Sequence, residues 1–489
     1  SGLTPANYPG IIIGGHQDWP WSALEPAEGQ YQWGIIDTWL DNQAAAGKPA
    51  GIAVDTFRNE SPADSATPQW VYNAGVPYAY CGGKRIPHYW NTLYQQKFGN
   101  FVRALAARYD NDPRVAWVQI SVGMYGETAP AEASAADCLK AAGLDSTKWI
   151  ATVNAITDIY RQAFRSKPLF LQFAPRFLSP CERREFTTYA VSLGVGLKHN
   201  GLAPDADATV IDDPGYSLYR CGAYDPILQY WPSVPIAWEG TYPYYLADST
   251  LAYWGILSGL AKHADYLVLG RQIITDTANA DILRFANRMS GQSVETAPAA
   301  WVALRESGFY WYAERGNFGE WLTQDDSVPG GDTRAVTWRD GFCNPQQTDR
   351  TASDYCDGYE VQQGSLVDEV NVSYLAGAKE GWITRRTDQA SGNRDMFFKL
   401  DDAFIISPPV TITVTYFDRG FDSWELKYDG ANSPEESAGI VYKGNTNTWK
   451  RVSFILYDAL FTNRQAGGSD FHIDCRGDGD EIVHMVVVE

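Results

Sequence analysis

Two apolar segments of the chain each end in a glutamate. Residues Val115–Glu127 read VAWVQISVGMYGE, and residues Val234–Glu239 read VPIAWE. Barrel enzymes hold their catalytic acids in this way, at the ends of buried strands. Hydrolysis of a glycosidic bond needs one carboxyl group to protonate the leaving oxygen and a second to attack or to activate water. Glu127 and Glu239 are therefore the first candidates for catalysis, and the chemistry that they predict is the cleavage of sugars.

The residues around each glutamate indicate different roles. Gly123 and Gly126 precede Glu127 and leave room for a substrate. Burial among aromatic side chains would raise the pKa of Glu127, as a general acid requires. Glu239 would be the nucleophile, kept ionised by hydrogen bonds and by neighbours such as Tyr242.

Other polar and aromatic residues follow predicted strands or lie in long loops. Carboxylates such as Asp55, Asp212 and Asp213 suit hydrogen bonding to sugar hydroxyls, and aromatic rings suit the apolar faces of sugars. Asp212 is also a candidate for an inverting catalytic pair. The residues that we expect to contact substrate are His16, Asp55, Trp90, Tyr125, Asp212, Trp238 and Tyr242.

Strand-like and helix-like segments alternate from about residue 10 to residue 270, which is typical of an α/β fold with a parallel sheet. The clearest helix has Phe98, Phe101, Val102, Leu105 and Tyr109 on one face. The predicted strands begin at Ile11, Trp19, Gly51, Val115, Leu169, Ala208, Val234 and Tyr266. Their number is that of a (β/α)8 TIM barrel, with Glu127 after the fourth strand and Glu239 after the seventh.

The pattern changes in the last third of the chain. Short strands separated by turns follow Val367, namely 396–400, 410–416, 424–428, 449–456, 471–474 and 482–488, and they predict an antiparallel β-sandwich. We expect a catalytic barrel with long aromatic loops over residues 1–340, a cysteine-containing linker over 341–362 and a sandwich domain over 363–489. The sandwich would either bind polysaccharide or brace the barrel.

Composition narrows the classes of partner. The 489 residues include 39 Lys and Arg against 59 Asp and Glu, a net charge of −20. Such a charge repels nucleic-acid phosphate, so we expect a polysaccharide or oligosaccharide partner and no nucleic acid. No apolar run reaches the ~18 residues of a membrane helix. The sequence does not indicate an oligomeric state.

The cysteines and acidic runs suggest little metal or cofactor chemistry. The 7 cysteines form no C-x-x-C motif, and Cys343 and Cys356 bracket a loop that a disulfide could close. Because Ser1-Gly2 resembles a trimmed start, we expect an extracellular or periplasmic protein that has lost its leader. Asp478 and Asp480 are weak candidates for structural calcium in an acidic turn that lacks EF-hand spacing. No phosphate loop or dinucleotide motif is present, so we expect no organic cofactor.

Several motifs resemble the clan A glycoside hydrolases. Trp21–Pro26 (WSALEP) with Glu28–Tyr31 (EGQY) is similar to a segment of β-galactosidase-like members such as family 42, and Pro87–Pro113 resembles the helix that leads into their fourth strand. The likeness spans roughly residues 10–270. It implies a retaining barrel enzyme with its acid/base after strand four and its nucleophile after strand seven, which fall on Glu127 and Glu239.

One position departs from that pattern. Most of the clan has an asparagine before the acid/base, where it binds the sugar 2-hydroxyl, and this chain has Gly126. The glycine-glutamate ending is similar to less characterised barrel families and to the inverting β-amylases. Two alternatives therefore stand beside a retaining hydrolase of β-linked sugars. One is an inverting glycosidase, and the other is a catalytically inactive barrel that binds carbohydrate.

Overall fold

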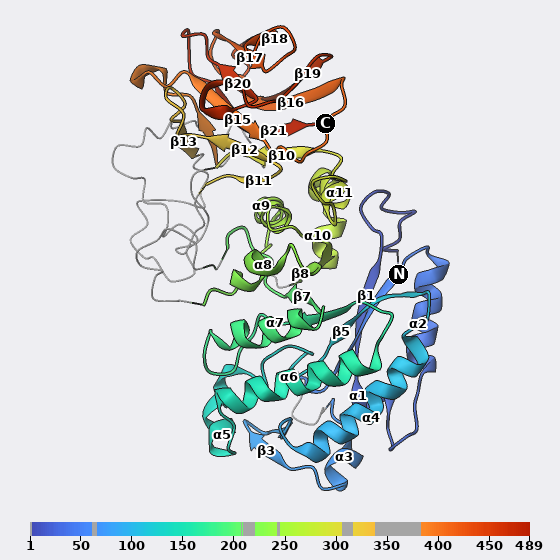
Figure 1. Ribbon diagram of the computed structural model, residues 1–489. Helices are drawn as coiled ribbons and strands as arrows, with labels where there is room; N and C mark the ends of the chain where they lie inside the picture. Colours follow the sequence, from blue (N-terminus) through green and yellow to red (C-terminus); the bar gives the residue numbers. More distant parts are fainter. Residues whose placement is uncertain are drawn as a thin grey trace.

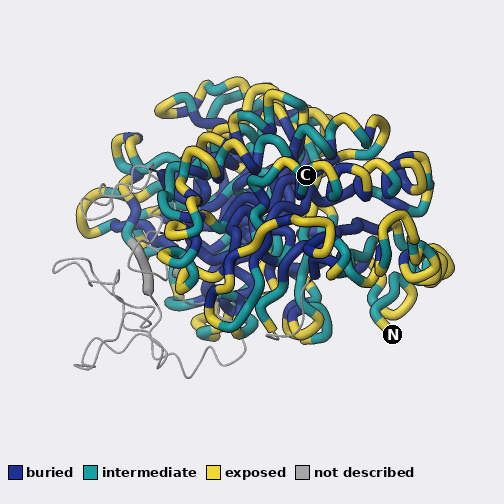
Figure 2. Tube along the Cα trace, turned by 90° about the horizontal axis from the view of Figure 1, so that it is seen from below, coloured by how far each residue is buried: buried dark blue, intermediate teal, exposed yellow. Residues whose placement is uncertain are grey.

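A computed structural model describes residues 2–60, 66–206, 208, 221–241, 245–305, 316–337 and 383–489. Figure 1 shows an α/β region formed by the first part of the chain and an antiparallel β region at the C-terminal end. In Figure 2 the buried stretches of chain run through the centre and the exposed stretches lie at the rim. Among the described helices, none has the length and apolar character needed to cross a membrane.

The α/β region is built on a parallel sheet in the order β1-β2-β5-β6-β7-β8-β9. Its strands are β1 (Gly15–Pro20), β2 (Ala50–Asp55), β5 (Val115–Ile120), β6 (Leu169–Gln172), β7 (Gly196–His199), β8 (Ile236–Gly240) and β9 (Tyr266–Leu269). Every neighbouring pair is parallel, as strands joined through helices must be. Among the described residues no pairing joins β9 to β1, so the closed barrel of eight strands stays a prediction.

Helices lie between the strands along the chain and cover the sheet. The helix predicted from Phe98 and its neighbours is confirmed as α4, in which Asn91 caps the first turn and the predicted apolar face is buried. The helices of this region are α1 (Trp21–Leu24), α2 (Gly34–Ala45), α3 (Gln69–Asn73), α4 (Thr92–Tyr109), α5 (Ala136–Ala141), α6 (Ser146–Ala163), α7 (Glu182–Ser192), α8 (Asp225–Tyr230), α9 (Ser249–Leu260), α10 (Arg271–Thr275) and α11 (Ala280–Met289).

One expectation about the strands was wrong. The segments beginning at Ile11 and Trp19 are not two strands, because one strand, β1, ends at Pro20 and α1 begins at Trp21. The strand between β6 and β8 is β7, which the sequence did not predict, and most of the expected strand Ala208–Ile211 lies outside the described residues. Glu127 therefore follows the third strand of the described sheet, and Glu239 lies near the end of the sixth. They remain three strands apart, as the sequence predicted.

The C-terminal strands form two antiparallel sheets. One joins β11-β10-β21-β14-β13 with β16 and β19, and the other is β12-β15-β20-β17-β18. The two sheets face each other, since Tyr416 of the first contacts Trp424 of the second with ring centroids 5.4 Å apart. The strands are β10 (Ala300–Ala303), β11 (Phe318–Glu320), β12 (Leu322–Asp325), β13 (Arg334–Thr337), β14 (Ile383–Arg386), β15 (Asp395–Leu400), β16 (Val410–Phe417), β17 (Ser423–Tyr428), β18 (Glu436–Tyr442), β19 (Trp449–Leu456), β20 (Phe471–Asp474) and β21 (Ile482–Val488).

The first four of these strands come from residues 300–337, on the barrel side of the boundary expected from the sequence. The expected linker, 341–362, with Cys343 and Cys356, lies outside the described residues. The two regions also pack together, because Trp301 of β10 is buried in the core of the α/β region and Tyr253 of α9 is 2.7 Å from His484 of β21. The C-terminal sheets thus contact the α/β region directly.

Candidate active site

Side chains along each strand alternate between the two faces of the parallel sheet, and this alternation decides which of them lie on the inner face. Trp117 of β5, Phe170 of β6 and Ala237 of β8 form a small apolar cluster apart from the main core. Residues two positions further along each strand lie on the same face. That rule places Gln119, Gln172 and Glu239 in the next layer, toward the carboxyl ends of the strands, with Lys198 of β7 opposite Gln172.

Glu127 lies just after β5 in a tight turn. Tyr125 and Gly126 both have positive φ, 52° and 76°, which glycine adopts without strain. A side chain at Gly126 would also approach Gln119 within 2.8 Å. The turn buries the Glu127 carboxyl group, which accepts hydrogen bonds from Gln172 Nε2 at 3.1 Å and from Asn200 Nδ2.

Burial raises the pKa of Glu127 to about 7. The hydrogen bond from Asn200 opposes this rise, while the nearby charge of Glu239 adds to it. A carboxyl group with such a pKa keeps its proton up to neutral pH, because its ionised form has lost the solvation of water. Glu127 can therefore donate a proton near neutral pH.

Glu239 lies in β8 and has the opposite electrostatic character. Its Oε2 accepts a hydrogen bond from Lys198 Nζ, and its Oε1 accepts one from Thr241 Oγ1 at 2.7 Å. Burial acts to raise the pKa of Glu239, but the charge of Lys198 and these hydrogen bonds outweigh it, so the pKa is lowered overall. Glu239 is therefore ionised at the pH at which Glu127 is protonated.

A chain of polar side chains joins the two glutamates. Gln172 donates to Glu127 through Nε2 and accepts from Lys198 Nζ through Oε1, and Lys198 donates to Glu239. These residues come from consecutive parts of the sheet, and the register pairs Gln172 with Lys198. The network fixes both carboxyl groups and holds a positive charge beside only one of them.

The sequence did not indicate Gln172, Lys198 or Asn200. Lys198 is 0% exposed, although lysine is almost never fully buried without a partner. The segment that contains two of them, Gly196–Asn200 (GLKHN), ends in three consecutive polar residues, so its pattern does not indicate a buried strand.

His16 and Asp55 are both on the interior face. His16 stacks on Trp117 at 4.9 Å, and burial, followed by the charge of Lys198, lowers its pKa to about 4, so it is neutral. Glu239 also influences its charge state, which places His16 beside the network. Asp55 belongs instead to a cluster with Arg58, which donates to it at 2.6 Å, and Asp18. Burial and the proximity of Asp18 raise the pKa of Asp55 to about 8.

The predicted aromatic contacts have different outcomes. Tyr125 is half-buried in the Glu127 turn, and its hydroxyl accepts a hydrogen bond from the Asn59 amide at 3.3 Å. Trp90 is half-buried and stacks on His88 at 4.3 Å. Trp238 is 0% exposed and packs against His199 and Tyr224, so the expectation that it contacts substrate was wrong. It alternates with Glu239 and faces the helices.

The remaining site predictions are two substrate contacts and two candidates for calcium binding. Asp212 and Tyr242 lie outside the described residues. Asp478 and Asp480 are in the C-terminal sheets, where Ser423 donates to Asp478 and Arg386 and Gln389 donate to Asp480. Over the described ranges, no three His, Cys, Asp or Glu side chains converge in a way that could hold a metal ion. The calcium site considered for these two aspartates stays a prediction.

The aromatic segment before α4 is more ordered than a plain loop. It contains α3 and a hairpin of β3 (Tyr78–Cys81) and β4 (Lys84–Pro87). A disulfide joins Cys81 to Cys138 of α5, and a second joins Cys181 to Cys221. Both disulfides lie in segments that follow strands of the parallel sheet, on the side where Glu127 and Glu239 are held.

Comparison with known proteins gives a family match for part of the chain. Residues 16–142 match the family model of glycoside hydrolase family 42, described as β-galactosidase, and the matched range includes Glu127. This confirms the resemblance seen in the motifs around Trp21 and before β5. No curated protein matches the chain by sequence.

Solved structures with some similarity are also glycosidases. A β-galactosidase from the psychrophilic Marinomonas ef1 is 14% identical, with a TM-score of 0.35, over 53% of this chain and 50% of that one. Xylanase B from Clostridium stercorarium F9 is 14% identical, with a TM-score of 0.30, over 55% of this chain and 87% of that one. The chain thus matches about half the length of the β-galactosidase.

Proposed function

We propose that this chain, of which residues 16–142 match the model of glycoside hydrolase family 42, is a glycoside hydrolase that cleaves β-glycosidic bonds of an oligosaccharide or polysaccharide by a retaining mechanism. The observation that carries the proposal is the opposite shift of two pKa values within one network. The pKa of Glu127 is raised to about 7, whereas that of Glu239 is lowered. Two carboxyl groups whose pKa values are shifted in opposite directions are suited to the roles of acid and nucleophile.

In the first step the protonated Glu127 donates its proton to the glycosidic oxygen as the bond to the anomeric carbon breaks. The ionised Glu239 attacks that carbon through a carboxylate oxygen and forms a glycosyl-enzyme. Lys198 and Thr241 hold the Glu239 carboxylate in place while it attacks. Gln172 and Asn200 orient the Glu127 carboxyl group toward the leaving oxygen.

In the second step Glu127 is ionised and acts as a base. It removes a proton from the water molecule that attacks the anomeric carbon, and the bond to Glu239 breaks. The positive charge of Lys198 stabilises the Glu239 carboxylate as it leaves. Both glutamates then return to their starting protonation states, so the proton balance of the cycle closes.

The substrate is proposed to be a neutral β-linked sugar, with β-galactosides first because of the description of the matched family. The net charge of −20 disfavours anionic glycans. His16, which lies beside the network, and Tyr125, in the Glu127 turn, would contact the sugar, and Trp90 would extend the aromatic surface of the segment before α4. Asp55 would act as a hydrogen-bonding group, not as a catalyst.

Location outside the cytoplasm is part of the same proposal. Two disulfides, Cys81–Cys138 and Cys181–Cys221, support an extracellular or periplasmic site, because disulfides persist in oxidising compartments. An enzyme in such a compartment would meet polymeric sugars.

The test uses aryl β-galactosides whose leaving groups differ in acidity. With Glu239→Gln, hydrolysis of every substrate should be lost. With Glu127→Gln, a poor leaving group such as 4-methylphenol should lose about 10²–10⁴-fold in rate, and 2,4-dinitrophenol, which needs no proton, should lose far less. Glu132→Gln is the matched control, since Glu132 follows the same turn but is exposed.

The stereochemistry of the first product, followed by proton NMR, decides the mechanism. Release of the β-anomer supports retention. Release of the α-anomer would establish an inverting enzyme instead. If the wild-type chain binds sugars but cleaves none of the galactoside, xyloside and glucoside series, the binding-protein alternative replaces the proposal.

A further inference from the structure

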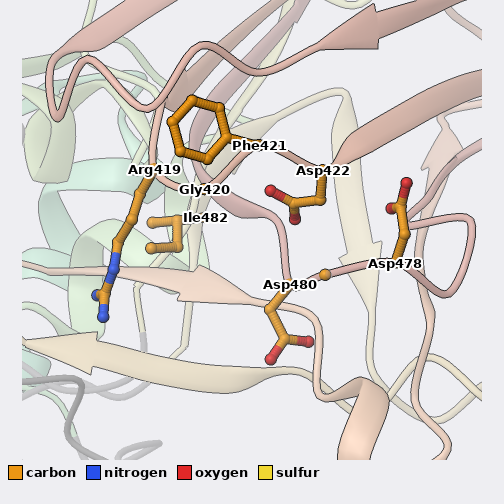
Figure 3. A pocket seen from close by; sticks show the side chains of 8 residues that line it. Arg419, Gly420, Phe421, Asp422, Asp478, Asp480 and Ile482 are labelled. Carbon is orange, nitrogen blue, oxygen red and sulfur yellow. The ribbon is translucent and has the colours of Figure 1, made fainter.

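A pocket of about 600 Å³ lies in the C-terminal sheets. The loop between β16 and β17 contributes Arg419, Phe421 and Asp422, and the loop between β20 and β21 contributes Asp478 and Asp480. Figure 3 shows the ring of Phe421, the guanidinium of Arg419 and the three carboxylates around this pocket. Neither loop supplies a residue to the network of Glu127 and Glu239, so the pocket is a separate site.

The pocket is held by fixed loops. The buried Asp418 carboxylate accepts hydrogen bonds from the amides of Gly444 and Thr446, and the Asn445 side chain accepts one from the amide of Gly420. A side chain at Gly479 would collide with the Asp422 carboxylate, so glycine allows the second loop to approach the first. The walls are therefore preorganised before any ligand binds.

The lining combines an exposed ring with hydrogen-bonding groups. Phe421 is 83% exposed, so its ring is accessible to a ligand. Asp422 is 10% exposed, and its Oδ1 is buried without a hydrogen-bond partner while its Oδ2 pairs with Lys443 at 2.8 Å. A flat apolar ring beside an unused buried acceptor suits a ligand with an apolar face and hydroxyl donors.

Protein donors occupy the carboxylates in ways that disfavour a cation. Asp478 accepts from Ser423 at 2.9 Å, and Asp480 accepts from Arg386 at 3.1 Å and from the Gln389 amide at 2.8 Å. The three aspartates do not converge as a metal-binding group within the described part of the chain. Each carboxylate oxygen still has lone-pair capacity for a hydroxyl.

We propose that this pocket binds a neutral sugar unit of a glycan chain, with one sugar face on Phe421 and its hydroxyl groups donating to Asp422 and Asp480. The proposal rests on the proposed function for the class of ligand, because a chain that cleaves sugars meets glycans. The three aspartates against one arginine disfavour uronic or sulfated sugars. The pocket would hold the enzyme on a polymer while the barrel residues act elsewhere on it.

The test compares Phe421→Ala with wild-type full-length chain by native affinity electrophoresis in soluble β-galactan, β-xylan and β-glucan. Loss of the ring should weaken binding to at least one polymer by about five- to tenfold, the range expected for a stacking contact. Phe421→Trp should retain binding. Tyr457→Ala is the matched control, since Tyr457 is 74% exposed in the same region but does not line the pocket.

Hydrolysis of a small aryl β-galactoside separates this proposal from the proposed function. Phe421→Ala should leave that rate unchanged. If wild type cleaves the galactoside but Phe421→Ala binds all three polymers as wild type does, the pocket proposal is overturned and the catalytic one stands. If wild type cleaves nothing, and Phe421→Ala binds the polymers more weakly than wild type does, the catalytic proposal is overturned and the pocket proposal stands. The pocket proposal is also overturned if wild type binds no polymer but binds calcium in calorimetry, and if Asp422→Asn abolishes that calcium binding.

Discussion

The ammonium group of Lys198 donates a hydrogen bond to the Glu239 carboxylate from a position with no exposure to solvent. Its second acceptor is Gln172 Oε1, which links it to Glu127. A buried charge is retained at a cost in desolvation unless it is paired. Here the pairing keeps Glu239 ionised, while burial keeps Glu127 protonated.

Replacing Lys198 by methionine should move the acid limb of the pH profile of kcat/KM to higher pH. In wild type the pKa of Glu239 is below its ordinary value, chiefly because Lys198 outweighs burial. Without Lys198 the largest effect that opposes burial is lost, so the pKa of Glu239 rises, while the hydrogen bond from Thr241 still acts to lower it. We expect a larger loss of kcat/KM at pH 5.5 than at pH 7.5 in the variant, and the pH profile of kcat/KM over that range measures it.

Lys262→Met is the control for that measurement. Lys262 is also buried, but its ammonium group contacts Ser258 of α9. Its loss should lower stability without moving the acid limb. An unchanged acid limb in Lys198→Met would show that Lys198 does not set the charge of Glu239.

Glu127→Gln should make the unfolding free energy less dependent on pH. The folded pKa of Glu127, about 7, is above its ordinary value of 4.5, so the folded chain binds more protons between these values. Stability from this group is therefore full below pH 4.5 and falls as pH rises to 7. The shift corresponds to about 3 kcal/mol. In denaturant unfolding, the variant should gain stability relative to wild type at pH 8 but not at pH 5. An equal difference in unfolding free energy at both pH values would contradict the raised pKa.

The two catalytic candidates were predictable because each lies near the carboxyl end of an apolar strand. The apolar strand β5 and a short turn precede Glu127, and Pro235–Trp238 directly precede Glu239, a pattern that is visible in one sequence. The three-strand separation also followed from counting strands. The number of strands did not, because the apolar run Ile11–Ile13 lies outside any strand, whereas β1 includes the polar residues His16, Gln17 and Asp18.

The network itself could not be predicted in the same way. Lys198 and His199 are consecutive polar residues, so the sequence of β7 does not indicate a buried strand. In the structure, alternation places Lys198 on the inner face of the sheet and His199 among the helices. Alternation also explains the error at Trp238, which is adjacent to Glu239 and must therefore point away from it. In the C-terminal region the six predicted strands are confirmed, and β18 was missed because Glu436–Tyr442 has little alternation of buried residues.

Asn200→Ala should shift the basic limb of kcat/KM to higher pH and lower its plateau. The hydrogen bond from Asn200 opposes the rise in the pKa of Glu127, so its removal lets burial act more fully. Loss of a hydrogen bond to an ionisable group, about 1.5–3 kcal/mol, corresponds to a loss of about 10- to 100-fold in kcat/KM if it is made in the transition state. Because Gly126 stands where related enzymes have asparagine, the same variant should raise KM if Asn200 also contacts the sugar. A plateau and basic limb equal to wild type would remove Asn200 from the site.

Removal of the Cys81–Cys138 disulfide should lower stability more than it lowers activity. The bridge closes a loop with a sequence separation of 57 residues, for which chain entropy predicts about 4 kcal/mol. The double variant Cys81→Ser with Cys138→Ser should therefore unfold at lower denaturant concentration, while kcat at 25 °C stays close to wild type because neither residue contacts Glu127 or Glu239. Cys475→Ser is the control, since Cys475 is a free, buried cysteine. If the double variant instead keeps its stability and loses kcat, the bridge acts by positioning the aromatic segment before α4, and that result would assign the hairpin of β3 and β4 to the substrate site.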